Sequence, residues 1–185
     1  MKDMVNETNH SIDALVSRIG KTEVLACYQC KKCSAGCPVS PDMDILPHQV
    51  IRMVQFGMKE RLLNSKTIWL CASCETCTTR CPNDVDLAKV MDVLRQMAIN
   101  SGEPLGDSRV PFFHSVFLSS IRKRGRIYEL EMIAKYKLKN REFKKDIKLG
   151  IMMFIKGKLK LLSPKIKGKK EIKDIFSQLK KGVIG

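Results

Sequence analysis

The chain has 185 residues, of which 44% are hydrophobic and 29% are charged, so it has enough apolar side chains for a packed core. Its longest apolar stretch covers only residues 149–155, whereas a membrane-spanning helix needs about 20 apolar residues, and we expect no transmembrane segment. The formal charge of +15 lies in one part of the chain: residues 1–103 carry 12 Lys and Arg against 12 Asp and Glu, and residues 104–185 carry 22 against 7.

Residues 1–20 are predicted to form an N-terminal helical arm. Ser11 is suited to cap a short amphipathic helix at Ile12–Ile19, whose apolar residues recur at helical spacing. We interpret this helix as one that docks on the following domain. The stretch 1–15 has no apolar core like that of a signal peptide, and we therefore expect a cytoplasmic protein.

All eight cysteines lie in two blocks of identical spacing. The first block is Cys27-x2-Cys30-x2-Cys33-x3-Cys37-Pro38, and the second block is Cys71-x2-Cys74-x2-Cys77-x3-Cys81-Pro82. This spacing is typical of bacterial [4Fe–4S] proteins, because three cysteines on one turning loop can reach three corners of the same cubane. The sequence therefore predicts two [4Fe–4S] clusters as the cofactors.

The fourth cysteine of each block has a separate role in known two-block proteins, where it ligates the cluster of the other block. We therefore predict two crossed ligand sets. The first cluster would be held by Cys27, Cys30, Cys33 and Cys81, and the second by Cys71, Cys74, Cys77 and Cys37.

Two other uses of these cysteines fit the spacing less well. Structural zinc usually takes its ligands as two separated pairs, whereas each block here contains four cysteines. Disulfides need an oxidising compartment, which the expected cytoplasmic location does not provide.

The residues between and after the blocks predict helices. Pro47 suits the first turn of a helix, a second helix is expected at Lys59–Leu63, and Ser65 is a candidate cap for a third that leads into the second block. Asp86 opens a longer helix that should stop near Gly102. No stretch alternates as a strand would, so we predict an all-α fold that resembles the α-helical ferredoxin domain, at residues 21–102.

Residues 103–185 are predicted to be a basic helical C-terminal extension. Apolar residues at helical spacing indicate helices within four ranges, 110–121, 127–138, 146–162 and 171–181. Basic helices of this kind can bind nucleic acid, an anionic membrane surface or an acidic protein face. We favour docking on other subunits, and we expect no nucleic acid as a partner, because no recognised binding motif is present.

The sequence contains no catalytic constellation that we can identify. It has no Gly-x-Gly fingerprint for a dinucleotide or flavin, no phosphate-binding loop, and no cysteine beyond the eight predicted ligands. These features favour an electron relay over a catalyst. Lys31 and Lys32 are candidates to raise the potential of the first cluster and Glu75 to lower that of the second, unless water screens all three.

The segments ACYQCKKCSAGCPVS, PHQVIRMVQFGMKERLL and WLCASCETCTTRCPNDVDLAKVMDVLRQMA resemble the C-subunit of heterodisulfide reductase from methanogenic archaea. The resemblance implies a non-catalytic part of an oxidoreductase complex. This part would pass electrons from the flavin-containing A-subunit to the B-subunit, which reduces the disulfide of coenzyme M and coenzyme B. The resemblance further implies a hydrogenase or formate dehydrogenase as the indirect electron source, with electron bifurcation at the flavin.

Two alternatives to this function remain. The chain could be an iron–sulfur subunit of another anaerobic, quinone-linked dehydrogenase. It could also be an iron–sulfur protein that binds nucleic acid, in which case its affinity would depend strongly on salt.

Overall fold

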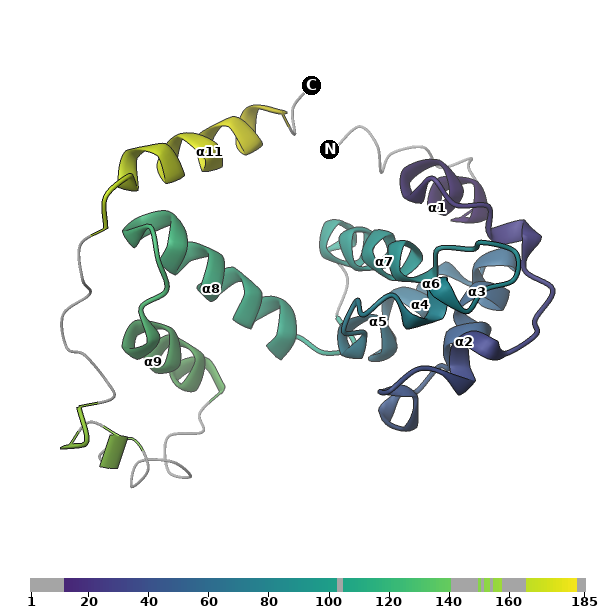
Figure 1. Cartoon of the computed structure of the whole chain (residues 1–185), viewed down its shortest axis with the longest axis horizontal. Coiled ribbons are helices and arrows are strands. Elements are labelled where there is room, and N and C mark those ends of the chain that lie inside the picture. Colours follow the sequence, from purple (N-terminus) through teal and green to yellow (C-terminus); the bar gives the residue numbers. More distant parts are fainter. Residues whose placement is uncertain are drawn as a thin grey trace. The chain divides into compact units, whose positions relative to one another are not determined.

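The fold is known from a computed structural model, which describes residues 12–102, 105–140, 150, 152–153, 155–157 and 166–182. Every regular element of these residues is a helix, which confirms the predicted all-α fold (Figure 1). The chain separates into two compact units, Met1–Ser108 and Arg109–Gly185. Among the described residues, no helix combines the length and the apolar composition needed to cross a membrane.

The first unit contains seven α-helices and two 3-10 helices in its described residues. In chain order they are α1 (Ile12–Gly20), η1 (Val24–Ala26), α2 (Lys32–Ala35), η2 (Ser40–Asp42), α3 (Pro47–Gln55), α4 (Lys59–Leu63), α5 (Thr67–Leu70), α6 (Thr76–Thr79) and α7 (Leu87–Ser101).

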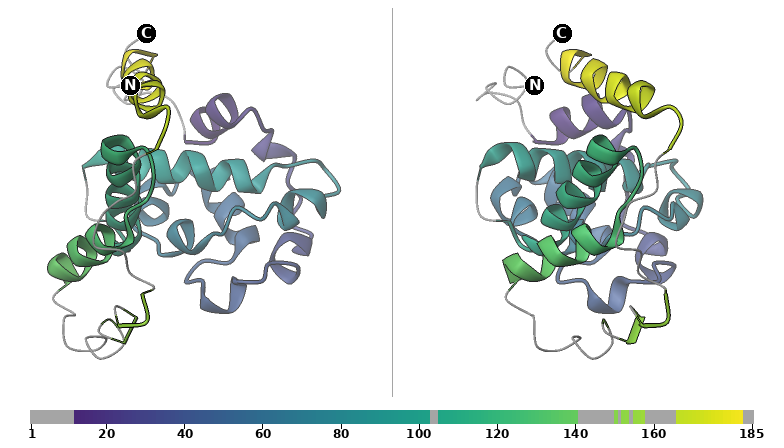
Figure 2. Two further views of the ribbon diagram at one scale, coloured as in Figure 1. Left: turned by 60° about the vertical axis from the view of Figure 1, so that its left-hand side comes forward. Right: turned by 90° about the vertical axis from the view of Figure 1, so that its left-hand side faces the viewer.

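The core of this unit forms around α7, the longest of its helices. Helix α1 packs along α7 on one side, and α3, α4 and α5 contact it elsewhere (Figures 1 and 2). Ile12, Leu15 and Val16 of α1 are buried, so the interpretation of this helix as one that docks on the domain is confirmed. Its predicted cap, Ser11, lies outside the described residues.

The ends of α3 and α7 follow from their local sequence. Pro47 is the first residue of α3, where its missing N–H has no intrahelical partner to lose. The carboxylate of Asp86 accepts a 3.0 Å hydrogen bond from the N–H of Lys89 and so caps α7 as predicted. Gly102 ends the helix with a φ of 71°, a conformation that glycine adopts at little cost.

The start of α5 differs from the prediction. Ser65 does not cap this helix, because its hydroxyl donates instead to the carbonyl of Leu62 at 2.8 Å. The cap comes from Asp44, whose carboxylate accepts hydrogen bonds of 2.9 Å from the N–H groups of both Lys66 and Thr67. A residue 22 positions earlier thus satisfies the first N–H groups of α5.

The second unit contains α8 (Arg109–Arg124), α9 (Glu129–Asn140) and α11 (Lys169–Gly182), close to three of the predicted ranges. Helix α8 packs against α9 and α11. Between α8 and α9 the rings of Phe113 and Tyr136 meet edge to face at 5.8 Å. The helix predicted within residues 146–162 lies largely outside the described residues.

Candidate metal centre

The two cysteine blocks follow the same backbone path. The second and fourth residues after the first cysteine have positive φ in both blocks: Gln29 (64°) and Lys31 (65°), then Ser73 (50°) and Glu75 (58°). A one-turn helix follows in each block, α2 in the first and α6 in the second. Because none of the four residues is glycine, each of these bends costs about 1 kcal/mol or more. The repeat in sequence is therefore also a repeat in structure.

A hydroxyl at the same position of each block links it to the next long helix. Ser34 Oγ lies 2.8 Å from Nδ1 of His48 and accepts a 3.0 Å hydrogen bond from the N–H of the same residue, at the start of α3. Thr78 Oγ1 donates at 3.0 Å to Asp86, the cap of α7. Each long helix is thus held at its N-terminus by the block that precedes it.

The fourth cysteine of the first block lies beside the second block. One recess is lined by four cysteines, Cys37, Cys71, Cys74 and Cys77. The other lining residues include apolar side chains on either side of η2 and from α3 and α7, such as Met91. The structure therefore brings together the four cysteines that the sequence assigns to one cluster.

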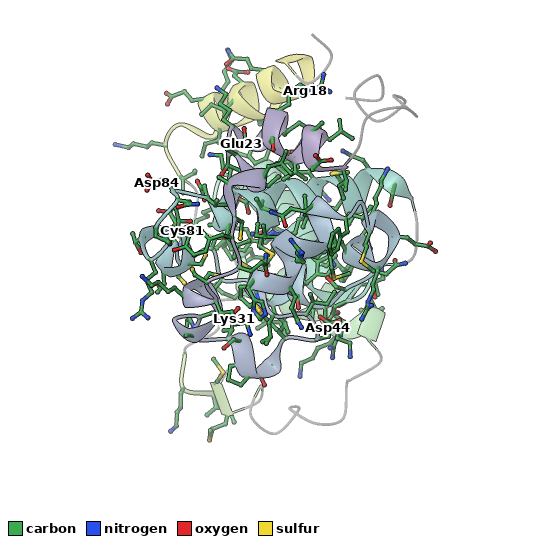
Figure 3. All side chains as sticks on the ribbon, turned by 90° about the vertical axis from the view of Figure 1, so that its right-hand side faces the viewer. Arg18, Glu23, Lys31, Asp44, Cys81 and Asp84 are labelled. Carbon is green, nitrogen blue, oxygen red and sulfur yellow. The ribbon has the colours of Figure 1, made fainter. Side chains whose placement is uncertain are left out.

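The fourth cysteine of the second block is followed by a segment that lies beside the first block. The side chain of Asn83 donates to the carbonyl of Ala26, which immediately precedes Cys27. The N–H of Asp86 donates to Oγ1 of Thr22 at 2.8 Å. Figure 3 shows Cys81 with Asp84 near it at the edge of this unit. Residues 81–86 therefore run next to residues 22–27.

Two sulfur atoms of the first set already accept hydrogen bonds. The backbone N–H of Val85 donates to Sγ of Cys81 at 3.3 Å, and the side-chain amide of Gln29 donates to Sγ of Cys27 at 3.4 Å. In the second set, Sγ of Cys74 lies 3.4 Å from the hydroxyl of Thr76. Such donors stabilise negative charge on sulfur.

Burial favours the protonated form of several of the thiols. It raises the pKa of Cys33 and Cys71, and it raises the pKa of Cys77 to about 11. Hydrogen bonds from Thr76 lower the pKa of Cys74, which is exposed. Because iron binds thiolates, loading of these sites must release protons and is favoured by higher pH.

The donor set fits iron–sulfur clusters. All eight cysteines are free thiols, and the second cysteine of each block, Cys30 or Cys74, is exposed while the other six are half-buried. Within the described residues, no three Cys, His, Asp or Glu side chains are close enough together to bind a single metal ion. The four cysteines of the second set line one recess without converging on a single point.

Two residues of the site were not found from the sequence. Gln55, at the end of α3, donates its side-chain amide to the carbonyl of Cys27 at 3.2 Å. Arg95, in the middle of α7, donates at 3.1 Å to the carbonyl of Cys71 and at 2.7 Å to Oγ of Ser73. Both lie more than 13 residues beyond the last cysteine of the block preceding their helix, and only their equivalent places on α3 and α7 could have indicated them.

Comparison with known proteins supports the same chemistry. Residues 23–85 match the 4Fe-4S dicluster domain family. The chain is 33% identical over 101 residues to the second iron-sulfur C-subunit of CoB--CoM heterodisulfide reductase from Methanocaldococcus jannaschii, and the match covers 55% of this chain and 54% of that protein.

Two further relatives carry related names. The C2-subunit of H(2)/formate:CoB-CoM heterodisulfide,ferredoxin reductase from Methanococcus maripaludis is 35% identical over 104 residues, 55% of this chain and 54% of that protein. The C-subunit of Ferredoxin:CoB-CoM heterodisulfide reductase from Methanosarcina acetivorans is 40% identical over 76 residues, 41% of this chain and 30% of that protein. The chain spans about half or less of the length of these curated relatives.

These matches confirm two of the predictions. The resemblance to the C-subunit of heterodisulfide reductase holds over the cysteine-containing half of the chain, and the domain carries two [4Fe–4S] clusters. The assignment of each thiolate to one of the clusters stays a prediction.

Proposed function

We propose, on the premise that residues 23–85 form a 4Fe-4S dicluster domain, that this chain is the electron-relay subunit of a heterodisulfide reductase complex. It would pass single electrons from a flavin subunit to the one that reduces the coenzyme M–coenzyme B heterodisulfide. The observation that carries the proposal is the duplicated four-cysteine block on one repeated backbone, in a chain similar to the C-subunits of that complex.

The proposed ligand sets are crossed. Cys37 would complete the set of Cys71, Cys74 and Cys77, with which it lines one recess. Cys81 would complete the set of the first block, because the segment after it is hydrogen-bonded to the residues before Cys27. Each cluster, when bound, supplies a one-electron redox centre. The chain's own part is to fix the positions of the eight thiolates and to donate hydrogen bonds to their sulfurs.

Docking on partner subunits is the proposed role of the second unit. Its helices leave large apolar side chains in solvent, including Leu138 (66% exposed) and Ile175 (55% exposed). Residues 104–185 also carry 22 Lys and Arg against 7 Asp and Glu. Exposed apolar side chains among basic ones suit a partner face that has apolar contacts and a surplus of carboxylates.

The proposal is tested by anaerobic affinity purification of the full chain from extract of its native cells, followed by mass spectrometry. We expect a flavoprotein and the protein that reduces the coenzyme M–coenzyme B disulfide to be retained together. Recovery of membrane dehydrogenase chains or of nucleic acid, without those two proteins, would contradict it.

A kinetic experiment complements the purification. The dithionite-reduced chain, freed of excess reductant, should be reoxidised by the coenzyme M–coenzyme B disulfide only after the purified disulfide-reducing subunit is added. A chain loaded with its clusters but changed at Leu138→Asp and Ile175→Asp is the matched control, and it should be reoxidised more slowly when that subunit is dilute. Equal reoxidation with and without the subunit would overturn the relay.

A further inference from the structure

At an otherwise repeated contact, the side chain that donates to the first cysteine is neutral in one block and charged in the other. In both blocks the carbonyl of the first cysteine accepts a hydrogen bond from a side chain on the following long helix. In the first site this donor is the neutral amide of Gln55, which also donates at 2.9 Å to the carbonyl of Val24 and accepts at 3.3 Å from the guanidinium of Arg52. In the second site it is the guanidinium of Arg95.

Arg95 is held in place and is largely shielded from water. Its side chain is 16% exposed, and it donates both to the carbonyl of Cys71 and to the hydroxyl of Ser73, one of the residues with positive φ. Its ion-pair partner, Asp92, is 48% exposed on the solvent side of α7, so water screens the carboxylate more than the guanidinium. The guanidinium is thus the less screened of the two charges, and it contacts the carbonyl of Cys71 directly.

The charged residues within the blocks themselves should affect the cluster potentials less than Arg95 does. Lys31, Lys32 and Glu75 are all exposed, as is Arg52 beside Gln55, and water and salt screen exposed charges over short distances. The charge of Arg95, which is the least exposed, is therefore the one expected to dominate. A positive charge favours the more negative, reduced state of a cluster and so raises its reduction potential.

We propose that Arg95 and Gln55 are positioning residues that set the two clusters at different reduction potentials, with Arg95 raising that of the second cluster relative to the first. The proposal rests on the crossed ligand sets proposed above, since these place the second cluster at the block that Arg95 contacts. The two clusters would then not be equivalent, and electrons would reside preferentially on the cluster beside Arg95.

The test is an anaerobic redox titration of the full chain with both clusters loaded, followed by EPR spectroscopy, in wild type and three variants. Arg95→Gln should move one of the two midpoint potentials to more negative values. The expected shift changes the oxidised-to-reduced ratio of that cluster at a fixed potential by about tenfold, which is 59 mV for a one-electron couple. Arg95→Lys, which keeps the charge, should recover most of that shift. Gln55→Arg should move the other midpoint to more positive values.

Lys89→Gln is the matched control, because it removes the same charge from an exposed position of α7. The midpoint potentials of this variant should differ from those of wild type by less than about a twofold change in the oxidised-to-reduced ratio. If Arg95→Gln loses a cluster on purification, Gln55→Arg and Arg95→Lys still test the proposal. It is overturned if Gln55→Arg leaves both midpoint potentials unchanged, or if Arg95→Lys shifts a midpoint potential.

The titration also separates this proposal from the relay function. It needs no partner protein, so failure of the affinity purification leaves its outcome unchanged. Movement of the same midpoint by Arg95→Gln and Gln55→Arg would overturn the proposal that each residue acts on its own cluster. Unchanged midpoints in both variants would show that neither side chain sets a potential.

Discussion

Cys37 and Cys71 line the same recess, although 33 residues separate them in the chain. If Cys37 ligates the second cluster, Cys37→Ser should alter the EPR signal of that cluster and leave the signal of the first. Cys33→Ser, in the same block, should do the reverse and is the matched control. Loss of the same signal in both variants would show that each block ligates its own cluster.

Gly106, which follows α7, packs closely against the backbone of Asn64 and Ser65. A side-chain carbon at this position would lie 2.6 Å from the backbone carbon of Ser65 and would also overlap the carbonyl oxygen of Asn64. Because backbone atoms cannot move aside, we expect Gly106→Ala to lower the free energy of unfolding by about 1–3 kcal/mol. Denaturant unfolding of the cluster-loaded protein measures this change.

Gly150 offers the matched control for that substitution. Nothing lies within 4 Å of a side-chain carbon built there, and the residue is helical. Gly150→Ala should therefore leave the free energy of unfolding unchanged or raise it slightly. An equal loss in both variants would refute the steric explanation for Gly106.

Asp44 connects the segment after the first block to the helix before the second. Its carboxylate accepts two backbone N–H groups and, at 2.7 Å, the hydroxyl of Thr67. Burial by itself would raise the pKa of Asp44, but these hydrogen bonds outweigh it and lower the pKa below its usual 3.8. We expect Asp44→Asn to reduce the free energy of unfolding by about 1 kcal/mol, as loss of a helix cap does.

The exposed Asp42→Asn removes the same charge two residues earlier and should have little effect on stability. Amide hydrogen exchange adds local detail, since the N–H groups of Lys66 and Thr67 should lose protection only in the Asp44 variant. Equal protection in the two variants would argue against the cap.

Glu131 supplies a pH-dependent contact in the second unit. Hydrogen bonds from Lys135 and then from Arg124 lower the pKa of Glu131 below its usual 4.5. Its stabilising contribution is therefore present above pH 4.5 and is lost as the pH falls through the lowered pKa. Carbon-13 NMR of the carboxyl group should show this lowered pKa in the oxidised protein.

In Lys135→Gln the pKa of Glu131 should rise towards its usual value. Lys123→Gln is the control for the change in net charge, because Lys123 is exposed. If both variants shifted the pKa of Glu131 equally, the cause would be the overall charge of the unit.

The sequence predicted the features that depend on local patterns. The spacing of the cysteines predicted the two clusters, and Pro47, Asp86 and Gly102 marked helix ends where the structure has them. These signals act within a few residues of each other, which is why one sequence is enough to find them.

The features that it missed depend on contacts between distant segments. Ser65 has the residue type of a cap, but Asp44 approaches from 22 residues away and replaces it. In the sequence, Arg95 is one polar residue among others in the predicted helix, and only the fold shows that its guanidinium donates to the carbonyl of Cys71. No local pattern encodes either contact.

The left-handed bends at Gln29, Lys31, Ser73 and Glu75 have a consequence for how this domain can diverge. Glycine would adopt these bends at less cost, but it would leave the surface beside each cluster bare. Because side chains occupy the positions instead, polar and charged groups can be exchanged there while the path of the loop stays the same. The exposed side chains of one block can therefore be replaced independently of those of the other, without a change in the backbone that positions the cysteines.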